Sequence, residues 1–117
     1  DTAKIDKLAK INLFHMEQLA YMLSKMRSIP EGDGNLLDNC MIVYGSGIGD
    51  GNRHNHEDLP TILLGRAGGA IKPGFRRVYR RETPMSNLFL TMMDIMGVTG
   101  VEHFGDSSGR INGLDLA

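Results

Sequence analysis

Apolar residues between positions 3 and 28 recur at steps of three and four, with charged and amide side chains between them. This spacing predicts an amphipathic helix, which we expect to end at Ile29-Pro30 because proline disfavours helical geometry in the preceding residue. Such a helix is about 39 Å long, so we expect its apolar side to pack against further protein. His15 falls near that side and is expected to be a packed, hydrogen-bonded residue. The apolar positions are Ile5, Leu8, Phe14, Leu19, Met22, Leu23 and Met26.

Two short apolar runs, 40–45 and 61–65, have the length and residue types of buried strands. A turn rich in glycine, Asp and Asn precedes the first run, at residues 31–35. The single cysteine, Cys40, lies in the first run and cannot form an internal disulfide, so we interpret it as a small core residue. We therefore expect both runs to be strands of the core.

A second helix is predicted between Thr83 and Gly97. Thr83 can cap the free amides at its start, and Pro84 is well tolerated at the first helical position. Gly97 supplies the C-terminal stop. The glycine-rich tail that follows, about residues 99–117, has few apolar side chains. We expect this tail to be mostly loop, attached to the rest through Phe104 and Leu114.

Length and charge limit the function classes. The 117 residues form one small domain or part of a larger one, and 13 basic residues balance 14 acidic ones. This balance gives no indication of nucleic-acid binding. No apolar run approaches the roughly 18 residues that cross a membrane, and the first residues do not resemble a secretion signal. The chain starts at Asp1 without a methionine, so we interpret it as a portion of a longer protein.

A local basic run surrounds Tyr79. One interpretation is a solvated loop. The other is that some of the arginines face an anionic ligand or partner, because the planar guanidinium fork suits phosphate and sulfate. The basic residues of the run are Lys72, Arg76, Arg77, Arg80 and Arg81.

The segment between the two predicted strands is the natural place for chemistry. It follows the carboxyl end of a strand, where ligands bind in open α/β sheets. It is glycine-rich at its start and polar throughout. Its ionisable residues are Asp50, Arg53, His54, His56, Glu57 and Asp58.

Three segments of the chain, 37–46, 54–65 and 83–98, together resemble the C-terminal part of the alkaline phosphatase superfamily, which includes sulfatases and cofactor-independent phosphoglycerate mutases. In that superfamily a strand after an Asp-Asn step delivers a Ser-Asp-His-Gly metal motif. A second histidine follows, with a proline six positions later, and His54 and Pro60 have this relationship. A helix ending in Leu-Gly or Met-Gly comes next, as Met96-Gly97 does here.

The chain also resembles the end of an uncharacterised, secreted bacterial family within this superfamily. The shared motifs are H-x-E-Q-L-A-Y at His15–Tyr21, Y-G-S-G at Tyr44–Gly47 and R-H-N-H at Arg53–His56. The resemblance implies an α/β fold, in which residues 1–117 are the C-terminal segment of one alkaline phosphatase-like domain. This segment would contribute part of the sheet and flanking helices, with the remainder of the domain upstream. A secreted or periplasmic location is implied by the resemblance only.

One departure from the superfamily pattern concerns the metal site. The Asp-His pair would follow Ser46, but this chain has Gly47-Ile48, which cannot bind a metal through side chains. Asp50 lies three residues downstream and could replace the carboxylate if the loop curls back. With His54 and His56 it forms a candidate ligand set of nitrogen and oxygen, which zinc or manganese accepts. The alternative is a polar surface loop in which these histidines and acids pair with each other or with the backbone.

Three functions remain open at this point. The first is the C-terminal portion of a metal-dependent hydrolase of phosphate or sulfate esters, in which Arg53 steadies the anionic substrate. The nucleophile of the superfamily lies upstream, so no catalytic residue is assigned here and the chain alone should be inactive. The second is a non-catalytic binding or structural protein of the same fold that has lost its metal site. The third is a small interaction module that uses the long N-terminal helix.

Overall fold

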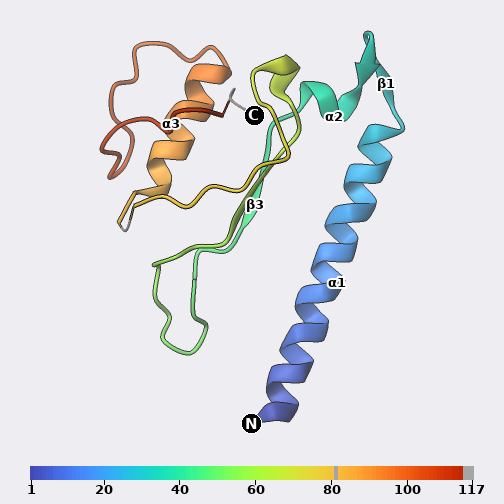
Figure 1. Ribbon diagram of the computed structural model, residues 1–117, viewed down its shortest axis with the longest axis vertical. Coiled ribbons are helices and arrows are strands. Elements are labelled where there is room, and N and C mark those ends of the chain that lie inside the picture. Colours follow the sequence, from blue (N-terminus) through green and yellow to red (C-terminus); the bar gives the residue numbers. More distant parts are fainter. Residues whose placement is uncertain (81, 115–117) are drawn as a thin grey trace.

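The computed structural model describes residues 1–80 and 82–114. Arg81 of the basic run and residues 115–117 of the tail lie outside the described residues. Helices combine with two small antiparallel sheets, which confirms the coarse α/β class. Figure 1 shows one long helix standing as an arm, with the small N-terminal hairpin at its C-terminal end and the second long helix on the far side of the central hairpin.

Helix α1 (Thr2–Arg27) confirms the predicted N-terminal helix. The Asp1 carboxylate accepts a hydrogen bond from the Ala3 amide at 3.1 Å, and Ser28, two residues before Pro30, is the C-cap. Leu19 is its single buried residue. His15 is exposed, so the prediction that it is a packed residue is wrong, because this part of the helix has no covering surface.

A small hairpin and a one-turn helix follow α1. Strands β1 (Pro30–Glu31) and β2 (Gly34–Asn35) pair around the turn predicted at residues 31–35. Helix α2 (Leu36–Asn39) occupies a stretch for which the sequence predicted only a connection to the strand. A capping box explains it, because the Asn35 and Asp38 side chains bond each other's backbone amides.

The two predicted strands form a single hairpin. Strands β3 (Ile42–Gly45) and β4 (Thr61–Leu64) pair antiparallel, with Ile42 opposite Leu64 and Gly45 opposite Thr61. Their side chains, like that of Cys40, are at most half-buried rather than part of a closed core. The two runs are strands, as predicted, and Leu63 packs against the core, but the expectation that the strands are buried is wrong. The segment between them is the tip of the hairpin, at the carboxyl end of β3 and the amino end of β4.

The core lies where the hairpin, the tail and a second helix meet. Ile71, Ile111 and Leu114 form its buried centre, so Leu114 attaches the tail as predicted. The half-buried side chains packed around this centre are Met41, Leu63, Ala67, Leu88 and Ile95. The other predicted anchor, Phe104, is 41% exposed and meets the edge of Phe89, with 6.5 Å between the ring centroids.

Helix α3 (Met85–Ile95) confirms the second predicted helix, and Gly97 follows it with a φ of 78°. The predicted cap is wrong. The Thr83 hydroxyl donates to the Arg80 carbonyl at 2.8 Å instead, and Pro84 is the N-cap residue without a side-chain bond.

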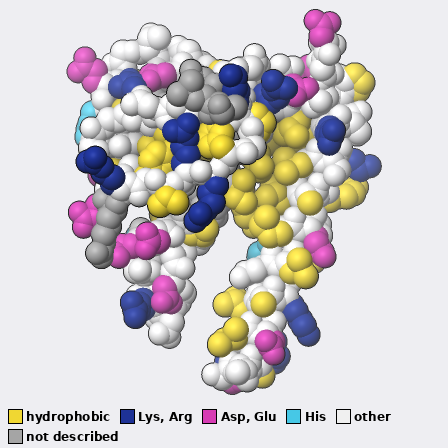
Figure 2. Space-filling view, viewed as in Figure 1, with side chains coloured by type: hydrophobic (Ala, Val, Ile, Leu, Met, Phe, Trp, Pro, Cys, Tyr) yellow, Lys and Arg dark blue, Asp and Glu magenta, His cyan; other side chains and the backbone are white. Residues whose placement is uncertain are grey.

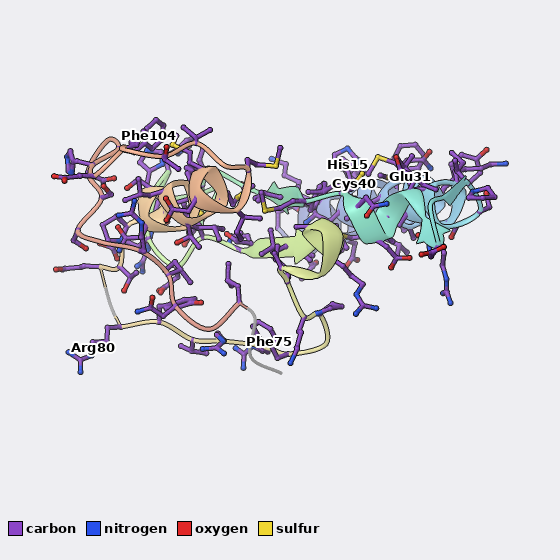
Figure 3. All side chains as sticks on the ribbon, turned by 90° about the horizontal axis from the view of Figure 1, so that it is seen from above. His15, Glu31, Cys40, Phe75, Arg80 and Phe104 are labelled. Atoms are coloured by element: carbon purple, nitrogen blue, oxygen red, sulfur yellow. The ribbon has the colours of Figure 1, made fainter. Side chains whose placement is uncertain are left out.

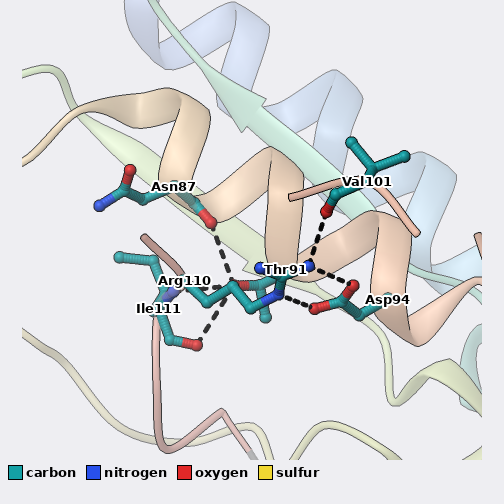
Figure 4. Close-up of polar contacts among 6 residues, drawn as sticks. All are labelled: Asn87, Thr91, Asp94, Val101, Arg110 and Ile111. Atoms are coloured by element: carbon teal, nitrogen blue, oxygen red, sulfur yellow. Dashed lines mark hydrogen bonds and ion pairs between the residues drawn. The ribbon is translucent and has the colours of Figure 1, made fainter. Parts of the chain in front are cut away.

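Polar side chains of α3 hold the tail along the helix (Figure 4). Thr91 Oγ1 accepts a hydrogen bond from the Ile111 amide at 2.8 Å, and Asn87 Oδ1 accepts one from the Ser108 amide at 2.8 Å. Arg110 binds the Asp94 carboxylate through both Nε and Nη2, and its Nη2 also donates to the Val101 carbonyl at 2.8 Å. The tail is thus a loop in secondary structure but is fixed by side-chain bonds.

The Asp94–Arg110 pair should make the attachment of the tail dependent on pH. The hydrogen bond from Arg110 lowers the pKa of Asp94, and burial opposes this effect only in part. A lowered carboxylate pKa stabilises the fold above the ordinary value, about 3.9, and this contribution is lost as the pH falls through the folded-state pKa. We expect wild-type tail amides near Arg110 to lose protection against hydrogen exchange as the pH falls below about 4. Asp94→Asn should remove this dependence.

The matched control is Asp33→Asn in the β1–β2 turn, which should keep the wild-type pH dependence. Tail protection that changes with pH equally in all three proteins would contradict a role for this ion pair.

The surface is larger than a closed domain of this size requires. The accessible area is 8861 Å², against ~6,300 Å² expected for a compact monomer of this mass. The radius of gyration is 16.4 Å, against ~13 Å expected. Figure 2 shows much of the excess as an apolar band along α1 and the adjoining surface. The most exposed large apolar residues of α1 are Ile5, Leu8, Leu13, Phe14 and Tyr21.

Candidate functional site

The candidate site is the segment 46–60, called here the tip loop, which projects from the β3–β4 hairpin (Figure 1). The hairpin closes its base, because the Ser46 amide donates to the Pro60 carbonyl at 3.3 Å. The loop brings Asp50, Arg53, His54 and His56 into one short, exposed stretch. The sequence-predicted site residues therefore all lie at the same end of the hairpin.

Asn55 organises the tip loop. Its carbonyl accepts from the Gly49 amide at 2.9 Å, and its side-chain oxygen accepts from the Asp50 amide at 2.8 Å. The loop also approaches itself closely at Gly49, where an added Cβ would lie 2.1 Å from the Glu57 carbonyl oxygen. The two sides of the loop therefore pair with each other between residues 49–50 and 55–57. Sequence reasoning did not assign Asn55 a role, although asparagine in a glycine-rich loop is a known signal for such turns.

The Asp50 carboxylate is partly engaged within the loop. Its Oδ1 accepts from the amides of Asn52 at 2.8 Å and Arg53 at 3.3 Å. Its Oδ2 lies 3.7 Å from Arg53 Nε, in a pair whose side chains are 49% and 78% exposed. An exposed pair of this kind contributes little, about 0–1 kcal/mol. Replacement of Arg53 by a metal ion at Oδ2 would therefore cost little stability.

The two histidines have distinct local settings. His54 has a φ of 54° and its amide donates to the Asp50 carbonyl at 2.8 Å. A left-handed conformation is uncommon outside glycine, and such residues cluster at functional sites. His56 Nδ1 lies 2.5 Å from the Gly47 carbonyl oxygen. Because a carbonyl oxygen only accepts, Nδ1 is the donor in this bond, and in the neutral ring the lone pair is then on Nε2.

The donor set fits a metal ligand set only in part. Carboxylate oxygen and neutral imidazole nitrogen are ligands that zinc and manganese accept. Within residues 1–80 and 82–114, however, no three His, Cys, Asp or Glu side chains are grouped closely enough to hold an ion. The tip loop in this form thus offers separate donors rather than a complete site.

No described helix is both long and apolar enough to span a membrane.

Comparisons with protein-family models, curated proteins and solved structures found no match to this chain. The relation to the alkaline phosphatase superfamily stays a prediction that rests on the motifs of the sequence.

Proposed function

We propose that this chain is the C-terminal portion of a secreted or periplasmic, metal-dependent hydrolase-like protein that acts on phosphate or sulfate esters. In this proposal the chain belongs to an alkaline phosphatase-like domain, and the tip loop forms one wall of its site. The upstream part of the domain supplies the nucleophile and the remaining ligands. The isolated chain is then inactive.

The orientation of His56 carries the proposal. Metal-binding histidines generally donate one ring N–H to a carboxylate, a carbonyl or a water, which fixes the tautomer and directs the other nitrogen to the metal. His56 has this arrangement, with Nδ1 on the Gly47 carbonyl. Gly47 stands where the superfamily motif has a metal-binding aspartate, so its backbone would serve the site in place of a side chain.

Asp50, His54 and His56 are the residues that would hold zinc or manganese. The metal would polarise the ester oxygens and lower the pKa of the attacking group. Arg53 would move from Asp50 Oδ2 to the anionic substrate, where a guanidinium stabilises the charge of the transferred group.

The large exposed surface is consistent with an incomplete domain. Soluble monomers rarely leave much apolar surface uncovered in one region, and several large apolar side chains of α1 are exposed. The upstream part of the domain would cover them.

A second function is favoured by Gly47-Ile48 and by the existing bonds of Asp50. Loss of the Asp-His pair removes two ligands, and the Asp50 carboxylate already accepts two amides. A non-catalytic exported binding or structural protein of the same fold would tolerate both.

Metal content tests the proposal. We expect the intact protein, purified with zinc and manganese present, to hold close to one metal ion per tip loop. Asp50→Ala, His54→Ala and His56→Ala should each reduce metal affinity by at least about 10- to 100-fold, the loss already typical of outer-shell changes. The measurement is plasma mass spectrometry of dialysed protein.

His15→Ala is the matched control, because His15 is exposed on α1 and remote from the tip loop in sequence. It should retain the wild-type metal content. No metal in any form, or equal metal in all forms, would refute the metal site and favour the non-catalytic alternative.

A further inference from the structure

The basic run forms an ordered strap across one edge of the molecule. We call residues 72–80 the strap; it is extended, has no regular secondary structure, and all of its side chains are exposed. Figure 3 shows it along an outer edge, with Arg80 pointing away from the body. Its basic residues are Lys72, Arg76, Arg77 and Arg80, and its large apolar residues are Phe75, Val78 and Tyr79.

Three attachments hold the strap in place. The Lys72 amide donates to the Leu114 carbonyl at 2.9 Å, and Arg77 Nη2 donates to the Gly113 carbonyl at 2.6 Å. At its far end the Arg80 carbonyl accepts from the Thr83 amide at 3.1 Å. The first two bonds tie the strap to the tail, and the third closes a turn at its far end. The strap is still an exposed loop, so both interpretations of the sequence stay open.

Among the described residues, no ion pair neutralises the positive charge of the strap. The sequence from Leu59 to Arg81 has six basic residues and no acidic one, in a chain of net charge −1. Within the described residues, the ion pairs join Arg53 with Asp50 and Arg110 with Asp94, and none involves the strap. A concentrated, unpaired charge of this kind attracts polyanions.

The exposed apolar residues of the strap indicate which class of anionic ligand it would bind. Val78 is 78% exposed and Tyr79 is 44% exposed. A soluble polyanion gives an exposed valine nothing to pack against, whereas a lipid headgroup layer does. Single-stranded nucleic acid is bound through several open aromatic faces. Here the Arg77 guanidinium lies over the Phe75 ring, 4.8 Å from its centroid, which leaves Tyr79 as the remaining aromatic ring of the strap.

We propose that the strap docks the protein on an anionic lipid surface. Arg76 and Arg80 contact lipid phosphates, and Val78 and Tyr79 enter the headgroup layer. Arg77 keeps its bond to Gly113 and sets the shape of the strap. Basic residues attract anionic leaflets, and aromatic and aliphatic side chains between them add burial.

Co-sedimentation with phosphatidylglycerol-containing vesicles tests this proposal in the intact protein. We expect binding to these vesicles and not to phosphatidylcholine alone. The double variant Arg76→Gln/Arg80→Gln should bind about 25-fold more weakly, from about fivefold per charge. Val78→Ser/Tyr79→Ser should bind about tenfold more weakly through lost apolar burial. The control Lys7→Gln/Lys10→Gln, on α1, should bind as the wild type does.

Three results would overturn the proposal. Equal binding to neutral vesicles would exclude recognition of charge. An equal loss of vesicle binding in the α1 control would mean that binding depends on the net charge of the protein and not on the strap. If Val78→Ser/Tyr79→Ser bound vesicles as the wild type does, apolar burial would play no part, and the strap would be a site for a soluble polyanion instead of a lipid surface. Vesicle binding is measured without hydrolysis, so the outcome is independent of the metal site, and circular dichroism verifies that each variant is folded.

Discussion

Gly65→Ala should destabilise the protein by about 3 kcal/mol or more, the largest effect expected of a single methyl group here. Gly65 has a φ of 89°, and a Cβ added there would lie 2.1 Å from the Cys40 carbonyl oxygen and 3.0 Å from that of Leu37. Both obstacles are backbone atoms that no rotamer change can move. The Cys40 carbonyl also accepts from the Ala67 amide at 2.9 Å, so relief of the clash would break the base of the hairpin.

Gly68→Ala measures the cost of the positive φ alone, without the steric clash that Gly65→Ala adds. Gly68 has a φ of 67°, but nothing lies within 4 Å of a Cβ added there. It should show only the strain of a left-handed alanine, about 1 kcal/mol. Urea unfolding of both variants measures the difference, and equal destabilisation would show that the close approach to Cys40 is not the cause.

Leu90→Ala should cost about 2–5 kcal/mol, the range for a large-to-small change in a packed core. Leu90 lies in the middle of α3 and its exposure is 0%. It is the largest side chain that is completely buried in the described part of the chain. Truncation removes the packing around this side chain and so weakens α3, the helix to which the tail is bonded.

Thermal and urea denaturation measure this loss. Leu13→Ala on α1 makes the same chemical change at a side chain that is 59% exposed, and should stay within about 0.5 kcal/mol of the wild type. If the two variants were equally stable, α3 would not be part of the core that determines stability.

Local sequence signals predicted most of the elements. Three- and four-residue spacing predicted α1, apolar runs predicted β3 and β4, and Gly97 predicted the end of α3, because each signal acts within a few residues. The capping box of α2 was also present in the sequence, but a single helical turn has no periodicity from which to recognise it.

Burial could not be predicted in the same way. The pattern of α1 identifies an apolar side, yet the surface that covers it is a property of whatever packs there. His15 and Cys40 were assigned to a core by their apolar neighbours, and both are less buried than expected. Periodicity gives the orientation of a helix but not the presence of its partner.

The candidate site shows the same division. The position of the tip loop, and of Asp50, His54 and His56 within it, followed from the order of strand and polar segment. The closing bonds of Asn55 and the bond from His56 to Gly47 depend on how the loop folds across itself. These contacts decide which ring nitrogen of His56 is free to bind a ligand, and the spacing of residues along the sequence does not show this.

The distance along the chain between Ile71 and Ile111 has a consequence for biosynthesis. These two residues pack together in the core but are separated by 40 positions. At about 5–20 residues per second, a ribosome needs roughly 2–8 s to add the second after the first. During that interval the apolar side chains of the hairpin have no tail to cover them, while α1 can already form. The nascent chain therefore exposes an unfinished core for seconds, which is long enough for a chaperone to bind it.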